Sequence, residues 1–179
     1  MTIVTPASDI DFYELTDEQA LLRSTLHEFA QGEIAPRAAK ADETGEFPWE
    51  NIHKMRELGL FGMLFPPEYG GAGLDTLSYA IAVEEISRAC ASTGITLAAH
   101  TSLGTWPIYR FGSEAQKRKY LPALCSGEKL AAFGLTEPEA GSDAGGTKTR
   151  AVKEGDRYTV NGRKIYITNG SVCGTAVFT

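Results

Sequence analysis

The sequence has few of the residues that build metal sites and disulfide frameworks. Among its 179 residues are three cysteines and three histidines, and all six are scattered along the chain. An odd number of distant cysteines predicts no disulfide framework, and neither residue type shows the spacing of metal ligands. The sequence therefore predicts no metal and favours a reducing, cytoplasmic location.

Long apolar runs and an excess of positive charge are also missing. No stretch approaches the ~18 apolar residues that cross a membrane. The first residues, MTIVTPASDIDFY, lack the basic start and the apolar core of a signal peptide. The 17 basic residues stand against 23 acidic ones, for a formal net charge of −6. We therefore expect no membrane and no nucleic acid as a partner, although backbone amides can still bind a phosphate locally.

The first two thirds of the chain show an apolar pattern of helical period. With 42% hydrophobic and 22% charged residues, the composition is that of a globular protein with one large domain or two small ones. Capping boxes, prolines and glycines mark the helix ends. The expected helices run from Thr16 to about Pro36, from Pro48 to Gly59, from Asp75 to Gly94, over 96–109 with an interruption at Pro107, and from Ser113 to Gly127.

After residue 130 the apolar period switches to two. Strands are expected at LAAFGLT, TKTRAVKE, RYTV, KIYIT and the final TAVFT. Asn161-Gly162 is the strongest hairpin signal in this part. The predicted fold class is α+β, with an all-helical N-terminal bundle over residues 1–129. An antiparallel β-domain over residues 130–179 follows, and it is incomplete, as in a truncated protein.

Two stretches of the β-region are candidates for ligand binding. In FGLTEPEAGSD, residues 133–143, Pro138 keeps the preceding residue extended and Gly141 allows a ligand to approach the backbone. In KIYIT, strand alternation would place Tyr166 and Thr168 on one face, where the ring packs on a flat ligand and the hydroxyl donates to its edge. Taken alone, the first stretch also suits an ordinary connection between strands, and the second also suits a half-exposed sheet face.

Together, the two stretches resemble the paired motifs of the acyl-CoA dehydrogenases, flavoenzymes that desaturate acyl-CoA thioesters. The likeness is carried by FGLTEPEAGSD and YTVNGRKIYITNG, and in the helical part by EEISRACASTG and FGSEAQKRKYLPALCSGE. The short-chain, butyryl-CoA type is the most similar. The resemblance implies FAD as cofactor, an acyl-CoA substrate, an electron-transferring flavoprotein as electron acceptor, a homotetramer, and a role in fatty acid β-oxidation and lipid metabolism.

The resemblance also implies roles for individual residues. The segment matching residues 133–142 lies in the family against the isoalloxazine and pyrophosphate of FAD, and Ser142 also matches a contact to CoA. Tyr166 and Thr168 match an aromatic residue and a threonine behind the flavin. Many relatives carry Trp in place of Tyr166 and Tyr in place of Phe133, so flavin tuning is expected to differ. The implied FAD-binding residues are Phe133, Gly134, Leu135, Thr136, Gly141, Ser142, Tyr166, Ile167 and Thr168.

No catalytic base is assigned. The resemblance implies that a carboxylate removes the α-proton of the thioester while a hydride leaves the β-carbon for the flavin. In the family this base usually comes from a C-terminal helical domain, which the sequence lacks, and Glu84, Glu85, Glu137, Glu139 and Asp143 do not match its position. The chain alone is therefore expected to be inactive and to hold FAD weakly. Two alternatives remain open: an acyl-CoA oxidase that passes electrons to oxygen, and a non-catalytic helical interaction module.

Overall fold

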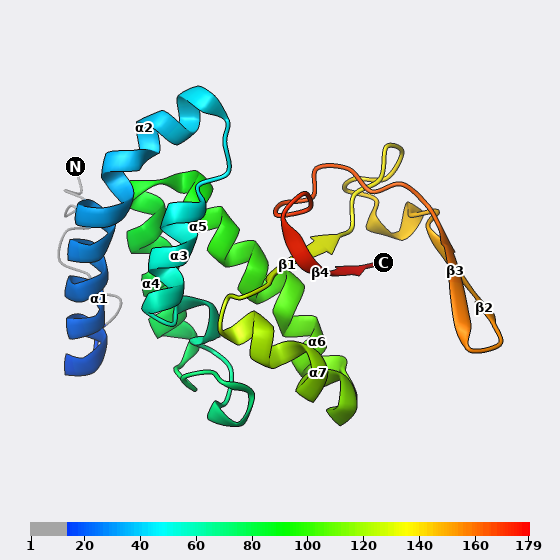
Figure 1. Ribbon diagram of the computed structural model, residues 1–179, viewed down its shortest axis with the longest axis horizontal. Coiled ribbons are helices and arrows are strands. Elements are labelled where there is room, and N and C mark those ends of the chain that lie inside the picture. Colours follow the sequence, from blue (N-terminus) through cyan, green and yellow to red (C-terminus); the bar gives the residue numbers. More distant parts are fainter. Residues whose placement is uncertain (1–13) are drawn as a thin grey trace, which may run out of the picture.

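The computed structural model describes residues 14–179, in which a helical body is followed by short strands (Figure 1). The predicted absence of a signal peptide concerns residues that lie outside this range. In the described part, no helix is long and apolar enough to cross a membrane. No group of three or more His, Cys, Asp or Glu residues within 14–179 is arranged to hold a metal ion.

The helical body is built from seven α-helices within residues 14–179. Both predicted capping boxes, Thr16 with Gln19 and Ser113 with Gln116, are present. π-Helical turns at Ala30–Ile34 and Ala99–Thr105 join neighbouring helices without a break. The α-helices are α1 (Asp17–Phe29), α2 (Ala35–Thr44), α3 (Trp49–Glu57), α4 (Thr76–Ala89), α5 (Ala91–Ala98), α6 (Trp106–Phe111) and α7 (Glu114–Cys125).

Three predicted helix boundaries are wrong. The first helix does not end near Pro36, because Pro36 lies in the first turn of α2, which follows α1 through a π-helical turn and continues to Thr44. The helix expected from Asp75 to Gly94 breaks at Cys90, whose extended backbone (φ −156°, ψ 107°) separates α4 from α5. Pro107 does not interrupt the next helix, because it lies in the first turn of α6 directly after a π-helical turn. A widened turn leaves room for a residue that cannot donate to the helix.

The hydrophobic core lies between the helices and reaches the first strand. Ile52, Met55, Phe61 and Ile86 are fully buried, and Leu130 at the start of β1 (Leu130–Gly134) belongs to the same cluster. Burying a side chain of this size contributes about 1.5–3 kcal/mol. The first strand is therefore anchored on the helical body.

The strands pair in two separate two-stranded sheets. β1 pairs with β4 (Cys173–Phe178), and β2 (Arg150–Glu154) pairs with β3 (Arg157–Asn161). The β2–β3 pair is antiparallel, but β1 and β4 are parallel. The expectation of an antiparallel β-domain is therefore wrong for β1 and β4. Parallel strands require a long crossover, which here contains the β2–β3 hairpin that extends away from the body (Figure 1).

Two predictions near residue 162 are also wrong. The hairpin turns at Gly155-Asp156, where Gly155 has a left-handed φ of 62°, and not at Asn161-Gly162. A glycine with positive φ at a central position is typical of tight two-residue hairpin turns. The KIYIT segment, residues 164–168, is not a strand, because Tyr166 within it (φ 57°) and Asn169 directly after it (φ 64°) have left-handed backbones. The alternation argument that placed Tyr166 and Thr168 on one strand face therefore fails.

Candidate functional site

The two motif stretches lie side by side at the end of β1. The Ile165 N–H donates to the Thr136 carbonyl at 2.9 Å, and Lys164 Nζ donates to the Leu135 carbonyl at 3.0 Å. A Cβ added at Gly134 would lie 3.2 Å from Lys164 Cγ. The structure thus brings the residues around Thr136 next to the residues around Tyr166, although not as neighbouring strands.

The first segment leaves hydrogen-bond donors free where β1 ends. Phe133 is half-buried and Gly134 is buried in β1, and the half-buried Leu135 and Thr136 follow outside the strand. Within residues 14–179, the N–H groups of Leu135 and Thr136 donate to no backbone carbonyl. Two amides and a hydroxyl are therefore available to a ligand at this point.

The chain then reverses and carries the next two predicted residues to the surface. Glu137 and Ala140 exchange two backbone hydrogen bonds, of 2.9 and 3.2 Å. Gly141 and Ser142 follow and are exposed. A Cβ added at Gly141 would meet no atom within 4 Å. The packing of this chain does not itself require glycine there, and the space beside it is open.

Tyr166 is the most unusual of the predicted residues. Its side chain is 90% exposed, and its φ of 57° is left-handed. A bulky residue rarely adopts this backbone conformation, and such outliers often mark functional sites. Ile167 and Thr168 beside it are half-buried. A large ring is thus presented to solvent one residue after Ile165, whose N–H bonds to Thr136.

Glu137 is a buried carboxylate within the first segment. Only 6% exposed, it accepts hydrogen bonds from Lys164 Nζ (2.8 Å), Thr149 Oγ1 (2.5 Å) and the N–H groups of Lys148 (2.6 Å) and Thr149 (3.0 Å). The Lys164 ammonium, followed by the Thr149 and Lys148 donors, lowers the pKa of Glu137 to about 2. A carboxylate stabilised in this way is a poor proton acceptor near neutral pH.

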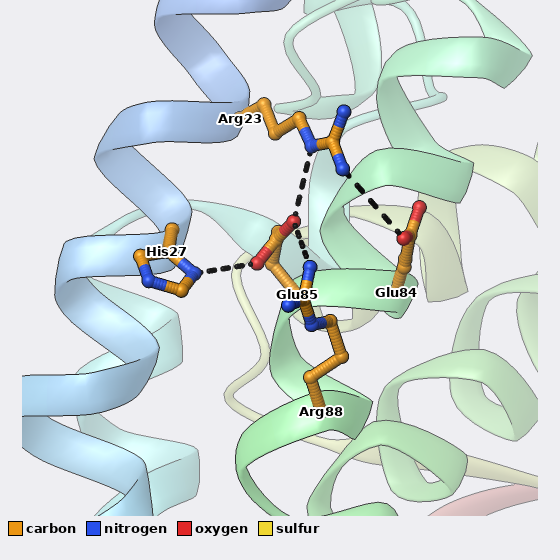
Figure 2. Close-up of polar contacts among 5 residues, drawn as sticks. All are labelled: Arg23, His27, Glu84, Glu85 and Arg88. Atoms are coloured by element: carbon orange, nitrogen blue, oxygen red, sulfur yellow. Dashed lines mark hydrogen bonds and ion pairs between the residues drawn. The ribbon is translucent and has the colours of Figure 1, made fainter. Parts of the chain in front are cut away.

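Glu85 is a second buried carboxylate, and it lies in the helical body between α1 and α4. It accepts from Arg23 Nε (3.2 Å) and Arg88 Nη1 (3.5 Å), and lies 2.9 Å from His27 Nδ1 (Figure 2). Burial raises the pKa of Glu85, but the hydrogen bonds from His27 and Arg23 outweigh it, so the pKa is lowered. Glu84 is exposed and reaches only Arg23, at 4.0 Å. The cluster ties α1 to α4, away from the end of β1.

The remaining two carboxylates are on the surface. Glu139 pairs with the Lys148 ammonium, and both side chains are exposed. Asp143 is also exposed and precedes the 3₁₀ turn Ala144–Gly146. Neither is held in a buried position that would tune it for proton transfer.

Both parts of the chain match one known family. Residues 16–128 match the family model described as acyl-CoA dehydrogenase, N-terminal domain, and residues 132–179 match the one described as acyl-CoA dehydrogenase, middle domain. The chain belongs to the acyl-CoA dehydrogenase family. The resemblance inferred from the sequence motifs is thereby confirmed.

Two curated relatives show how much of the family's length is present. A probable acyl-CoA dehydrogenase of Bacillus subtilis is 55% identical over 167 residues, which cover 93% of this chain and 44% of the relative. The short-chain specific acyl-CoA dehydrogenase of Clostridium acetobutylicum is 54% identical over 165 residues, which cover 92% and 44%. The chain therefore spans less than half the length of these acyl-CoA dehydrogenases.

Three solved structures share the fold over most of this chain. Butyryl-CoA dehydrogenase from Megasphaera elsdenii has a TM-score of 0.88 at 44% identity, over 93% of this chain and 44% of that one. An acyl-CoA dehydrogenase complexed with FAD from Bacillus anthracis scores 0.85 at 40% identity, over 92% and 29%. A chain in a structure described as the electron transferring flavoprotein of Acidaminococcus fermentans scores 0.89 at 48% identity, over 93% and 44%. The predicted fold class is thereby confirmed.

In this member of the acyl-CoA dehydrogenase family, Asn169 is a residue that the sequence reasoning missed. Its buried side-chain amide donates to the carbonyls of Ala131 in β1 and Thr96 in α5, each at 3.1 Å. The available signal was the Asn169-Gly170 pair, because asparagine before glycine favours a left-handed backbone.

His100 is a buried residue that joins β1 to the helices. Its Nδ1 accepts from the Ala131 N–H at 2.9 Å, and its Nε2 lies 3.1 Å from the Leu124 carbonyl. Since an amide only donates and a carbonyl only accepts, the proton is on Nε2 and the ring is neutral. Burial lowers the pKa of His100 to about 4. The strand that leads into the candidate site is therefore held by a neutral imidazole.

Proposed function

We propose that this chain is the FAD-contacting part of an acyl-CoA dehydrogenase that desaturates an acyl-CoA thioester between its α- and β-carbons. The observation that carries the proposal is the contact of the two motif stretches at the end of β1, through Ile165 N–H and the Thr136 carbonyl at 2.9 Å. Family membership supports it. A short acyl chain is favoured, since one relative is named short-chain specific and one solved neighbour is a butyryl-CoA dehydrogenase.

The residues at the end of β1 fit a flavin in their chemistry. The edge of the isoalloxazine ring carries oxygen and nitrogen acceptors, and the free N–H groups of Leu135 and Thr136 are donors of the matching kind. Tyr166 offers an exposed ring for packing. The proposed FAD-binding set is Phe133, Gly134, Leu135, Thr136, Gly141, Ser142, Tyr166, Ile167 and Thr168.

The open turn suits the phosphate end of the cofactor or the CoA. Ser142 is exposed, and the space beside Gly141 would hold a Cβ without contact to this chain. When bound, FAD supplies the electron acceptor for a hydride from the β-carbon of the substrate. The contribution of this chain is to hold and orient the ring and to present donors to it.

The proton acceptor is not proposed from residues 14–179. Glu137 and Glu85 are buried and hydrogen-bonded to cationic side chains. Glu84, Glu139 and Asp143 are exposed. A base that works on a thioester α-proton must lie against the substrate in a site that excludes water.

We propose further properties of the whole protein. It passes its electrons to an electron-transferring flavoprotein in fatty acid β-oxidation, and a chain of this fold occurs in a structure described as such a flavoprotein. It assembles as a homotetramer. It works in the cytoplasm, where the free thiols of Cys90, Cys125 and Cys173 stay reduced. Residues 1–129 and 130–179 are proposed as its first two domains.

Flavin analysis tests the proposal. The protein at the length of its relatives should be yellow as purified, release FAD on denaturation and reduce an artificial dye with butyryl-CoA. The 179-residue chain alone should be colourless, because a partial site lacks most contacts that offset the cost of ordering the ligand. Oxygen consumption with acyl-CoA would point to an oxidase. A long protein that contains no flavin and binds none would contradict the proposal.

A further inference from the structure

The segment that carries Tyr166 and Thr168 lacks the usual support of a strand. Residues 162–172 belong to no strand, and the backbone at Tyr166 is left-handed. A conformation of this kind persists only where the surroundings fix it. The segment therefore needs side-chain contacts that hold it against β1.

One anchor lies directly before the segment. The Lys164 ammonium, whose side chain is 13% exposed, donates to the Leu135 carbonyl at 3.0 Å and to Glu137 Oε1 at 2.8 Å. Glu137 also accepts hydrogen bonds from the backbone N–H groups of Lys148 and Thr149. One carboxylate thus ties together the turn at 135–140, the chain at 148–149 and the start of the Tyr166 segment.

The second anchor lies directly after the segment. The Asn169 amide donates to the Ala131 carbonyl in β1 and to the Thr96 carbonyl in α5, both at 3.1 Å. Asn169 is buried, and it too has a left-handed backbone. Residues 165–168 are therefore fixed at both ends to β1 and its continuation, and the Tyr166 ring between the anchors stays exposed.

We propose that Lys164, with Glu137, and Asn169 are positioning residues that set Tyr166 and Thr168 in place for FAD before the cofactor binds. The proposal rests on the proposed function. None of the three residues needs to touch the flavin. They act by fixing the distance between the donors at Leu135 and Thr136 and the exposed ring, which lowers the ordering cost of binding.

The Lys164→Met variant tests the first anchor. Methionine keeps most of the side-chain length but removes both hydrogen bonds and leaves Glu137 without its cation. Lys148→Met is the matched control, because the Lys148 ammonium pairs only with Glu139 and both side chains are exposed, at 73% and 70%. The backbone N–H of Lys148 still donates to Glu137 in that control.

In the protein at the length of its relatives, we expect Lys164→Met to weaken FAD binding and to change the redox potential of the bound flavin. FAD affinity should fall about tenfold in Lys164→Met relative to Lys148→Met, since a charge-assisted hydrogen bond is lost. The flavin midpoint potential should shift in Lys164→Met and stay unchanged in the control. Lys164→Arg, which keeps the cation, should restore most of the affinity.

Hydrogen exchange of the apoprotein gives a readout that does not depend on FAD. The hydrogen-bonded amides of Glu137, Ile165 and Gly170 should exchange faster in Lys164→Met and in Asn169→Ala than in the control. Should Lys164→Met fail to fold, Asn169→Ala supplies the same comparison from the other anchor.

The outcomes separate this proposal from the proposed function. Faster exchange with unchanged FAD affinity and potential would overturn the positioning role and leave a structural one. Unchanged exchange would overturn the anchor itself. A wild-type protein that binds no flavin would overturn the proposed function, and this proposal with it, whereas a wild type that binds FAD no better than Lys164→Met overturns only this proposal.

Discussion

Strand β1 and the β2–β3 hairpin show how differently strands of one chain can be held. In β1, Leu130, Ala131 and Ala132 are buried, and His100 and Asn169 both bond to Ala131. In β2 and β3, all ten residues are exposed. An isolated two-stranded hairpin is at best marginally stable in water. The helical body therefore stabilises β1 and the site beside it, whereas the hairpin relies on its own turn and pairing.

A core substitution in β1 should show the largest difference in stability between β1 and the β2–β3 hairpin. Leu130→Ala removes a buried side chain from the main cluster and should lower the free energy of unfolding by about 2–5 kcal/mol. Val152→Ala in β2, where the side chain is 52% exposed, is the control and should change it by less than about 0.5 kcal/mol. Urea unfolding measures both. Similar losses would show that the hairpin is as well supported as β1.

Substitutions of two threonines test the segment beside β1 against the hairpin. In the protein at the length of its relatives, Thr168→Val should weaken FAD binding by about 1–3 kcal/mol through loss of a hydrogen bond. Thr159→Val in β3 should have little effect, since the Thr159 hydroxyl reaches only Glu154, at 3.1 Å. Flavin titration of the two apoproteins gives the difference. Equal affinities and equal redox potentials would mean that Thr168 does not contact FAD.

Acid should destabilise the packing of β1 on the helical body. The pKa of His100 is about 4 in the folded protein against 6.5 for the free side chain, so the unfolded chain binds more protons between these values. The neutral His100 makes its full contribution to the free energy of unfolding above pH 6.5, and this contribution is lost as the pH falls toward 4. The loss between pH 6.5 and 5 should be about 2 kcal/mol.

The control separates His100 from other groups. His100→Gln should flatten the pH dependence of unfolding in this window, whereas His53→Gln at an exposed position should keep it. Glu137 has a lowered pKa and loses its contribution only below its ordinary value of 4.5. An unchanged slope in His100→Gln would contradict the assignment of a buried neutral imidazole.

The hairpin turn should give the smallest effect. Gly155→Ala forces a side chain into a left-handed backbone and should destabilise the β2–β3 pairing by about 1 kcal/mol. Gly32→Ala, at a helical position with no atom within 4 Å of the added Cβ, should cause no loss. Hydrogen exchange of the β2 and β3 amides reports the effect. A change that spreads to the helical body would show that the hairpin supports it.

Signals within a few residues predicted the helical part well. The capping boxes at Thr16 and Ser113 were found because cap and third residue are close in sequence. The break at Cys90 was missed because Ala89, Cys90 and Ala91 are all apolar and no proline or glycine marks the end of the helix there. Four predicted strands overlap strands of the structure, which lie at 130–134, 150–154, 157–161 and 173–178.

The errors in the β-region come from contacts over long sequence distances. The parallel pairing of β1 with β4 depends on a crossover that no local pattern specifies. The KIYIT segment has strand-like alternation, yet Lys164 and Asn169 fix it through partners 27 and 38 residues away. The adjacency of the two candidate stretches followed from family resemblance and not from alternation, which predicted the wrong geometry.

Anaerobic addition of butyryl-CoA to the purified protein at the length of its relatives tests the central claim most directly. The claim is that the stretches around Thr136 and Tyr166 form the flavin surface of an acyl-CoA dehydrogenase. The account predicts that the yellow absorbance bleaches on addition of the thioester, and that Thr168→Val alters the spectrum or the extent of bleaching. A protein without flavin, or a bound flavin that no acyl-CoA of any chain length reduces, would contradict it.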